Sequence, residues 1–183
     1  MHNQNFTPFP VLVTERLILR QLSLGDENQI LLLRSDEEVN KFLDRTRATS
    51  LEDARNFIVK INDNISRNES LFWGINLKND PGLIGTICLW NLSVDENKAE
   101  LGYEMLPAFQ GKGLMQEAVL KILQFGFEIM QLRTIEAWLR ADNSNSIKVL
   151  EKNNFKRDLP AENKMPAEEK LAGMVIYTLT KTK

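Results

Sequence analysis

The most informative residues are two glycines in a short run, between a strand-like segment and a long amphipathic segment. The run is Gln110-Gly111-Lys112-Gly113-Leu114-Met115. Glycine lets the backbone approach a ligand closely, and the free amides and dipole at a helix start favour a phosphate group. The run therefore predicts an anion site, with Lys112 as added positive charge. Tight turn geometry alone, with an exposed loop lysine, is the alternative interpretation.

Two common nucleotide-binding patterns do not match this run. A Walker loop needs Gly-Lys-Ser/Thr after a four-residue gap, and the sequence has none. A dinucleotide fingerprint needs glycine where Gln116 stands and an early βαβ unit. We expect an antiparallel meander before the run, which argues against a nucleotide-dependent α/β enzyme.

Two carboxylates lie shortly before the run, in the strand expected over residues 98–106. Side chains alternate along a strand with a period of two, so Glu100, Gly102 and Glu104 share one face. A carboxylate on an inward face could act as a general base. A solvated sheet face is the alternative.

Histidine and cysteine chemistry has little support in this sequence. The one histidine is His2 and the one cysteine is Cys88, within an apolar run. We therefore expect neither a Ser/His/Asp triad nor a histidine-based zinc site, and no metal. Cys88 is expected to be a small buried hydrophobe, and the lack of a possible internal disulfide favours a cytoplasmic protein.

The elements that would position these groups follow the hydrophobic periodicity. Ser50 and Asp53 form a capping-box pattern before an amphipathic helix that reaches residue 65. Strands are expected at residues 14–21, 71–77, 83–91, 98–106, 134–139, 155–157 and 174–180, and further helices at residues 27–34, 36–42, 114–130 and 143–153. Residues 1–13 are expected to be an extended arm, and the segment between the last two strands, with Pro160 and Pro166, a charged loop.

Length and composition indicate one α+β domain over residues 1–183. The chain has 43% hydrophobic and 26% charged residues and a net charge of -2. This balance argues against nucleic acid as a partner, because that function usually needs a basic face. The sequence shows neither a signal peptide pattern nor an apolar run of the ~20 residues that span a membrane.

The chain resembles the GNAT superfamily of acyl-CoA N-acetyltransferases, specifically its RimJ/RimL-like branch. The matching segments run in order along nearly the whole chain: Thr14-Glu15-Arg16-Leu17-Ile18-Leu19-Arg20, Ala99-Glu100-Leu101-Gly102-Tyr103-Glu104, the run from Gln110 to Met115, Asn143 with Ser146, and Leu150-Glu151-Lys152-Asn153-Asn154-Phe155. The resemblance implies a single GNAT-like domain with a mixed, mostly antiparallel central sheet flanked by helices. Met115 departs from the small residue usual in the family's glycine motif, and Asn154 departs from a usual glycine.

The resemblance also implies an acetyl-CoA site. The segment from Gln110 to Met115 (Gln110, Gly111, Lys112, Gly113, Leu114 and Met115) would hold the pyrophosphate. Met105 and Leu106 would lend backbone groups to the pantetheine and thioester, and Asn143 would contact the pantetheine arm.

Proton transfer in such an enzyme needs a base more than an acid, because a thiolate with a pKa near ~8.5 leaves readily. Glu100 matches the position of a catalytic glutamate in several GNAT enzymes and is the first candidate, with Glu104 in reserve. Many members use a tyrosine as acid where this chain has Leu150. Ser146 is the substitute that the branch suggests, and a simple first-turn helix hydroxyl is the alternative.

The resemblance predicts acetyl transfer from acetyl-CoA to a primary amine, which would be a protein N-terminus or a small molecule. A catalytically inactive acyl-CoA-binding sensor or scaffold is the alternative. The acceptor would be shaped by residues 34–65 and 159–172, which carry no motif of their own, and monomer and homodimer both remain open.

Overall fold

The computed structural model describes residues 6–181. Within them an 8-stranded sheet runs in the order β1-β2-β3-β4-β5-β6-β8-β7. Its strands are β1 Leu12–Val13, β2 Leu17–Arg20, β3 Leu71–Leu77, β4 Asp80–Ser93, β5 Lys98–Met105, β6 Thr134–Arg140, β7 Lys156–Arg157 and β8 Met174–Thr180. Neighbouring strands pair antiparallel except β5 and β6, which are parallel. The expected α+β fold with a mixed, mostly antiparallel sheet and the meander of β3, β4 and β5 are confirmed.

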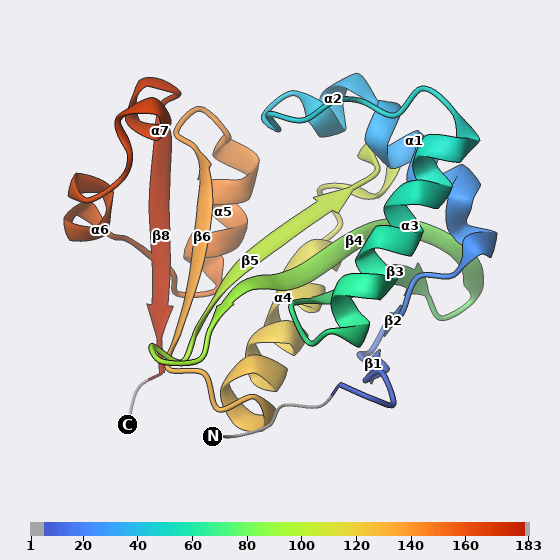
Figure 1. Cartoon of the computed structure of the whole chain (residues 1–183), viewed down its shortest axis with the longest axis horizontal. Coiled ribbons are helices and arrows are strands. Elements are labelled where there is room, and N and C mark those ends of the chain that lie inside the picture. The colour runs from blue at the N-terminus through green and yellow to red at the C-terminus, as the bar shows by residue number, and fades with distance from the viewer. Residues whose placement is uncertain (1–5, 182–183) are drawn as a thin grey trace.

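Helices cover both faces of this sheet. They are α1 Glu27–Ser35, α2 Glu37–Asn40, α3 Leu51–Ser66, α4 Leu114–Gln124, α5 Ser144–Lys152, α6 Leu159–Asn163 and α7 Ala167–Leu171. α1 and α3 lie in front of the sheet in Figure 1, and α4 lies behind it. Across residues 6–181, no helix combines the length and apolar character that a membrane crossing requires.

α3 begins at the expected capping box. The amide of Asp53 donates to Ser50 Oγ over 3.2 Å, and the amide of Ser50 donates to Asp53 Oδ2 over 3.1 Å. Ala54, Ile58 and Ile65 are buried along one side of the helix. The apolar stripe of α3 packs with α1 and fixes the position of the segment that joins them.

The helix that follows the glycine run is shorter than expected. We predicted one helix over 114–130, but α4 ends at Gln124 and the next turn, Phe125–Ile129, is π-helical. Gly126 packs so closely that an added Cβ would come within 3.0 Å of Ile135 Cδ1. Phe125 follows the buried Ile122 by three residues and is 8% exposed, whereas Ile129 at the end of the π turn is 69% exposed. The π turn, which sequence periodicity does not reveal, therefore changes which side chains of this last turn face the core.

The segment between β7 and β8 was wrongly predicted to be a loop, since it contains α6 and α7. Asp158 caps α6 by accepting a hydrogen bond from the amide of Ala161 over 3.0 Å. Pro160 lies in the first turn and Pro166 directly before α7, positions where the missing amide costs nothing. The error came from interpreting both prolines as helix breakers.

The described part of the N-terminal arm, from residue 6, packs on the sheet. β1 pairs with β2, and Trp73 Nε1 donates to the carbonyl of Pro10 over 2.8 Å. Phe6 is 7% exposed. His2 lies outside the described residues.

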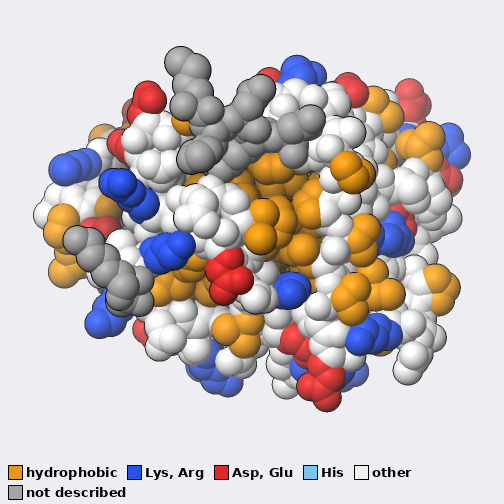
Figure 2. All heavy atoms as spheres, turned by 90° about the horizontal axis from the view of Figure 1, so that it is seen from below, with side chains coloured by type: hydrophobic (Ala, Val, Ile, Leu, Met, Phe, Trp, Pro, Cys, Tyr) orange, Lys and Arg blue, Asp and Glu red, His pale blue; other side chains and the backbone are white. Residues whose placement is uncertain are grey.

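The feature that creates a site is a fork between β5 and β6. Their pairing ends at Glu100 and Glu136, whereas β5 stays paired with β4 as far as Met105. The two strands therefore diverge towards the top of Figure 1. Figure 2 views the opposite, closed end, where hydrophobic side chains gather in the middle of the face.

Candidate active site

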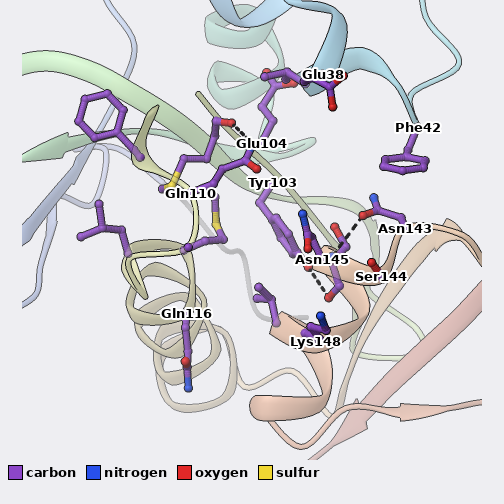
Figure 3. A pocket seen from close by; sticks show the side chains of 18 of the residues that line it. Glu38, Phe42, Tyr103, Glu104, Gln110, Gln116, Asn143, Ser144, Asn145 and Lys148 are labelled. Carbon is purple, nitrogen blue, oxygen red and sulfur yellow. Dashed lines mark hydrogen bonds between the residues drawn. The ribbon is translucent and has the colours of Figure 1, made fainter. Parts of the chain in front are cut away.

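A cavity of about 570 Å³ lies on the open side of the fork, between the glycine run and α5. It collects most of the residues predicted for the acetyl-CoA site, namely Met105, Gln110, Gly111, Gly113, Leu114, Met115, Asn143 and Ser146. Among the described residues, Leu106 and Lys112 are outside this lining. Lys148 and Lys152 of α5, which the sequence analysis did not single out, also line the cavity and add positive charge (Figure 3).

The backbone of the run needs glycine at two positions. Gly111 and Gly113 have φ angles of 73° and 74°, in the left-handed region that other residues rarely adopt. A Cβ at Gly111 would meet nothing within 4 Å, so conformation and not space excludes a side chain there. Gly113 is the N-cap of α4. The run therefore presents a helix start to the cavity, which is the geometry that suits a phosphate.

The run is fixed to the rest of the domain by contacts at both ends. Gln110 Nε2 donates to the carbonyl of Met105 over 2.8 Å. Arg16 Nη1 donates to the carbonyl of Lys112 over 3.0 Å, and Arg16 Nε pairs with Glu117 Oε2 at 2.6 Å. Arg16 was recognised only as part of a matching segment, because the pairing joins residues 101 positions apart.

Glu117 completes this anchor from the first turn of α4. Its Oε1 accepts the amide of Arg16 over 2.8 Å and also the hydroxyl of Thr14. Partial burial opposes ionisation, but the hydrogen bonds from Thr14 and Arg16 hold the pKa of Glu117 below its ordinary value. A charged Glu117 thus ties the start of β2 to the start of α4.

The strand edge that faces the fork differs from the expectation in one residue. The amide of Leu106 donates to Ile84 of β4 over 3.0 Å, and its carbonyl accepts from Phe109 over 2.9 Å. Backbone groups in an antiparallel pair alternate in direction, so Tyr103 and Met105 direct theirs away from β4, into the fork. Tyr103 thereby takes the place that we expected for Leu106.

Asn143 and Ser146 lie together at the start of α5. Asn143 Oδ1 accepts the amide of Ser146 over 3.2 Å, so Asn143 is the N-cap of the helix. The carbonyl of Ser146 accepts the hydroxyl of Tyr103 over 3.2 Å, which joins α5 to β5 across the fork. Burial raises the pKa of Tyr103, so this hydroxyl stays protonated and donates.

A second cavity, of about 730 Å³, adjoins the first and contains Glu100. Tyr103, Asn143 and Ser146 line both cavities. The lining of the second cavity also includes Lys41, Phe42, Asp44, Trp90, Gly102, Trp138, Arg140 and Glu169. Ser146 and Glu100 therefore face a common space at the point where the two cavities meet.

Glu100 is a half-buried carboxylate with an altered pKa. Burial raises the pKa of Glu100 from 4.5 to about 7, a hydrogen bond from Asn91 lowers it, and the charges of Glu136 and Glu169 raise it further. A group with a pKa near the working pH suits general base catalysis. Glu136 is its neighbour on β6, whereas Glu169 comes from α7, which the sequence analysis had treated as loop.

Glu104 shares the face of Glu100, as expected, but is held in an ion pair. Arg45 Nη2 lies 2.6 Å from Glu104 Oε2, and Thr86 Oγ1 donates to Glu104 Oε1 over 3.3 Å. Arg45 Nε in turn donates to Asn40 Oδ1 over 2.7 Å. Glu104 lines the first cavity and fastens the segment between α2 and α3 to β5, and its role as the reserve base stays a prediction.

Cys88 lies beneath the same sheet face, opposite Gly102. Burial raises the pKa of the Cys88 thiol to about 12. A thiol with this pKa is protonated at neutral pH and is a poor nucleophile. Cys88 is only partly buried, so the expectation of a small buried hydrophobe is met in part.

The fork thus brings together a glycine-capped helix start, a strand edge without a neighbouring strand and a half-buried carboxylate with a raised pKa. Comparisons with known proteins assign this arrangement to a family. Residues 16–156 match the family described as acetyltransferase (GNAT) domain. The uncharacterized N-acetyltransferase p20 of Bacillus licheniformis is 34% identical over 93% of this chain and 96% of its own length.

Two further similarities agree with that assignment. The uncharacterized N-acetyltransferase YoaA of Bacillus subtilis is 32% identical over 82% of this chain and 85% of its own length. The solved structure of RimL, a ribosomal-protein alpha-N-acetyltransferase, in complex with coenzyme A has a TM-score of 0.78 at 19% identity, and covers 93% of this chain and 98% of that one. The fork, the glycine run and these relatives together show that the chain belongs to the GNAT acetyltransferases.

Proposed function

We propose that this protein transfers the acetyl group of acetyl-CoA to a primary amine, a small molecule or a peptide N-terminus, as a cytoplasmic enzyme of the RimJ/RimL-like branch. The amides of the run from Gly111 to Met115 would bind the pyrophosphate, aided by Lys112, Lys148 and Lys152. The edge of β5 at Tyr103 and Met105 would pair with the pantetheine arm, and Asn143 would close the other side.

Glu100 would be the base in this reaction. It takes one proton from the ammonium group, the free amine nitrogen attacks the thioester carbonyl, the carbon–sulfur bond then breaks, and the second proton of the nitrogen goes to solvent. Ser146 would donate a proton to the departing thiolate and regain one from solvent. The observation that carries the proposal is the half-buried Glu100, with a pKa of about 7, beside the junction of the two cavities.

The first experiment tests cofactor binding. Acetyl-CoA should raise the melting temperature, because a ligand that binds only the folded state stabilises by about 2.7 kcal/mol at a hundredfold excess over Kd. Gly113→Val should abolish the shift. Gly173→Val is a matched control, because Gly173 has a φ of 72° with nothing within 4 Å of an added Cβ and is outside both cavity linings.

The second experiment tests catalysis by release of free thiol with a panel of amines. Thiol release that depends on the amine supports the enzyme. Tight binding of acetyl-CoA without release to any amine would contradict it and favour the alternative of an inactive acyl-CoA-binding scaffold. An equal thermal shift with NAD would contradict the cofactor assignment.

A further inference from the structure

The second cavity has an unusual wall, because two of the three tryptophans of the chain line it. Trp90 of β4 is 47% exposed, and Trp138 of β6 is half-buried. The third tryptophan, Trp73, is fully buried in the core. Large aromatic side chains left in contact with solvent at a cavity are candidate ligand contacts.

Strand register places both indoles on the face that carries Glu100. Trp90 pairs with Glu100, and Glu100 pairs with Glu136. Trp138 follows Glu136 by two residues and so points to the same side. Beyond Glu100 the strands diverge, so Trp90 and Trp138 stand on opposite sides of the opening fork.

Because Gly102 has no side chain, the part of the second cavity between Trp90 and Trp138 stays open. A Cβ at this position would approach Cys88 Sγ to 3.0 Å and Trp90 Nε1 to 3.7 Å. The indole of Trp90 thus leans over Gly102, towards the fork. A side chain at Gly102 would occupy the space in front of Glu100.

The charges around this space favour a cation. Glu100, Asp44 and Glu169 line the cavity, and Glu136 adjoins it. Asp44 lies on the exposed rim with two cations: Arg140 is paired with Asp142 at 3.1 Å, and Lys41 lies over the Phe42 ring at 5.5 Å. The less exposed charges of this cavity are therefore the carboxylates Glu100 and Glu169. Aromatic faces beside carboxylates attract an ammonium group, because the negative face of each ring and the carboxylate charge both favour a cation.

We propose that the acceptor is a small primary ammonium compound with a flat apolar body, such as an arylalkylamine. Its ammonium group would lie at Glu100 and its flat body over Gly102, between Trp90 and Trp138. This inference rests on the proposed function and specifies its acceptor. The cavity of about 730 Å³ has the size of a small-molecule site, and its aromatic walls offer a flat apolar body a larger contact than an extended peptide backbone would make.

The acceptor enters the cavity as an ammonium ion, but only its free amine can attack the thioester carbonyl. Glu100 in its ionised state takes one proton from the ammonium group, which leaves the nitrogen lone pair free for the thioester carbonyl. The second proton that the nitrogen loses on forming the amide goes to solvent, and the thiolate is protonated as described above.

The experiment compares kcat/KM, expressed per concentration of free amine because a peptide α-amino group is less basic than an alkylamine, for phenethylamine, tryptamine, n-butylamine, spermidine and a tripeptide with a free N-terminus. We expect the two arylalkylamines to exceed n-butylamine and the tripeptide by at least tenfold. Trp90→Leu and Trp138→Leu should each lower kcat/KM for phenethylamine by about 10-fold or more and for n-butylamine by less than threefold. Acetyl-CoA affinity, measured by thermal shift, should not change in either variant.

Two further variants complete the design. Gly102→Val should lower turnover of every amine while acetyl-CoA affinity is kept. Leu171→Ala, at a residue that is 88% exposed on α7, is the matched control and should behave as the wild type.

The outcomes separate the two proposals. Turnover of amines without an aromatic preference, or best turnover of spermidine or the tripeptide, would overturn this inference and leave the proposed function standing. An equal loss for aryl and alkyl amines in the tryptophan variants would also overturn it. No thiol release with any amine would overturn both.

Discussion

Glu100 and Glu104 are chemically identical groups on the same face of β5, four residues apart, and the fold gives them opposite roles. Glu100 lines a cavity beside two other carboxylates, and its pKa rises to about 7. Glu104 is only 8% exposed and pairs with Arg45 at 2.6 Å. A carboxylate that is partly buried without an ion-pair partner has a raised pKa and can act as a base. A carboxylate that pairs with a cation stays charged and holds parts of the fold together.

The sharpest way to break this comparison is to neutralise Glu100. Glu100→Gln should lower kcat by about 10² to 10⁴, the usual contribution of general acid–base catalysis. Acetyl-CoA affinity, measured by thermal shift, should stay almost unchanged. The loss should shrink in alkaline buffer, because the amine there loses its proton unaided. Wild-type rates at neutral pH in this variant would refute the assignment.

Neutralising Glu104 should instead destabilise the fold. Glu104→Gln leaves Arg45, which is 22% exposed, without its partner. Since breaking a fully buried pair costs 3–5 kcal/mol and Arg45 keeps some solvent, we expect a loss of about 2 kcal/mol in denaturant unfolding. Its effect on kcat should be below tenfold. A pH-dependent loss of kcat like that of Glu100→Gln would transfer the role of base to Glu104.

The pH profile of the wild type sharpens the same contrast. If Glu100 must be ionised, kcat should fall about tenfold per pH unit below its pKa, which lies near 7. Glu104→Gln should keep this midpoint, and Glu100→Gln should lose it. A midpoint near 4.5 in the wild type would show that burial does not raise the pKa of Glu100.

The smallest expected effect is on the free energy of unfolding. Glu100→Gln should raise this free energy at alkaline pH, whereas Glu104→Gln should lower it. The pKa of Glu100 is higher in the folded protein than its ordinary value of 4.5, so its contribution to stability is lost as pH rises through about 7. Glu100→Gln should therefore stabilise the protein at pH 8, by about 1 kcal/mol after allowance for solvent exposure. The gain should vanish near pH 4.5, and urea unfolding at both pH values measures it.

The local parts of this site were predictable from sequence. The glycine run, the amphipathic helix after it and the shared face of Glu100 and Glu104 depend on residues only a few positions apart. Ser50 with Asp53 marked the start of α3 for the same reason, because a capping box is formed within one turn. Turn chemistry and strand periodicity act over such distances whatever the rest of the chain does.

Two predictions were wrong, namely the length of α4 and the loop between β7 and β8. Their causes are also local, but hydrophobic periodicity does not reveal them. The π turn after Gln124 depends on how closely Gly126 packs against Ile135. The helices α6 and α7 begin with prolines, which a helix tolerates only in its first turn. Both features change where side chains point: the first leaves Ile129 exposed, and the second brings Glu169 to the second cavity.

The sequence by itself determined the family resemblance, most of the strand and helix order and the types of residue available for chemistry. Only the tertiary structure decided which of them act together. Arg45 meets Glu104 across 59 residues, and Arg16 meets Glu117 across 101. The fork brings Trp90, Glu100 and Trp138 from three strands to one cavity. The pKa of a carboxylate depends on burial and on charges brought near by folding, so two glutamates in one strand could be distinguished only once the chain was folded.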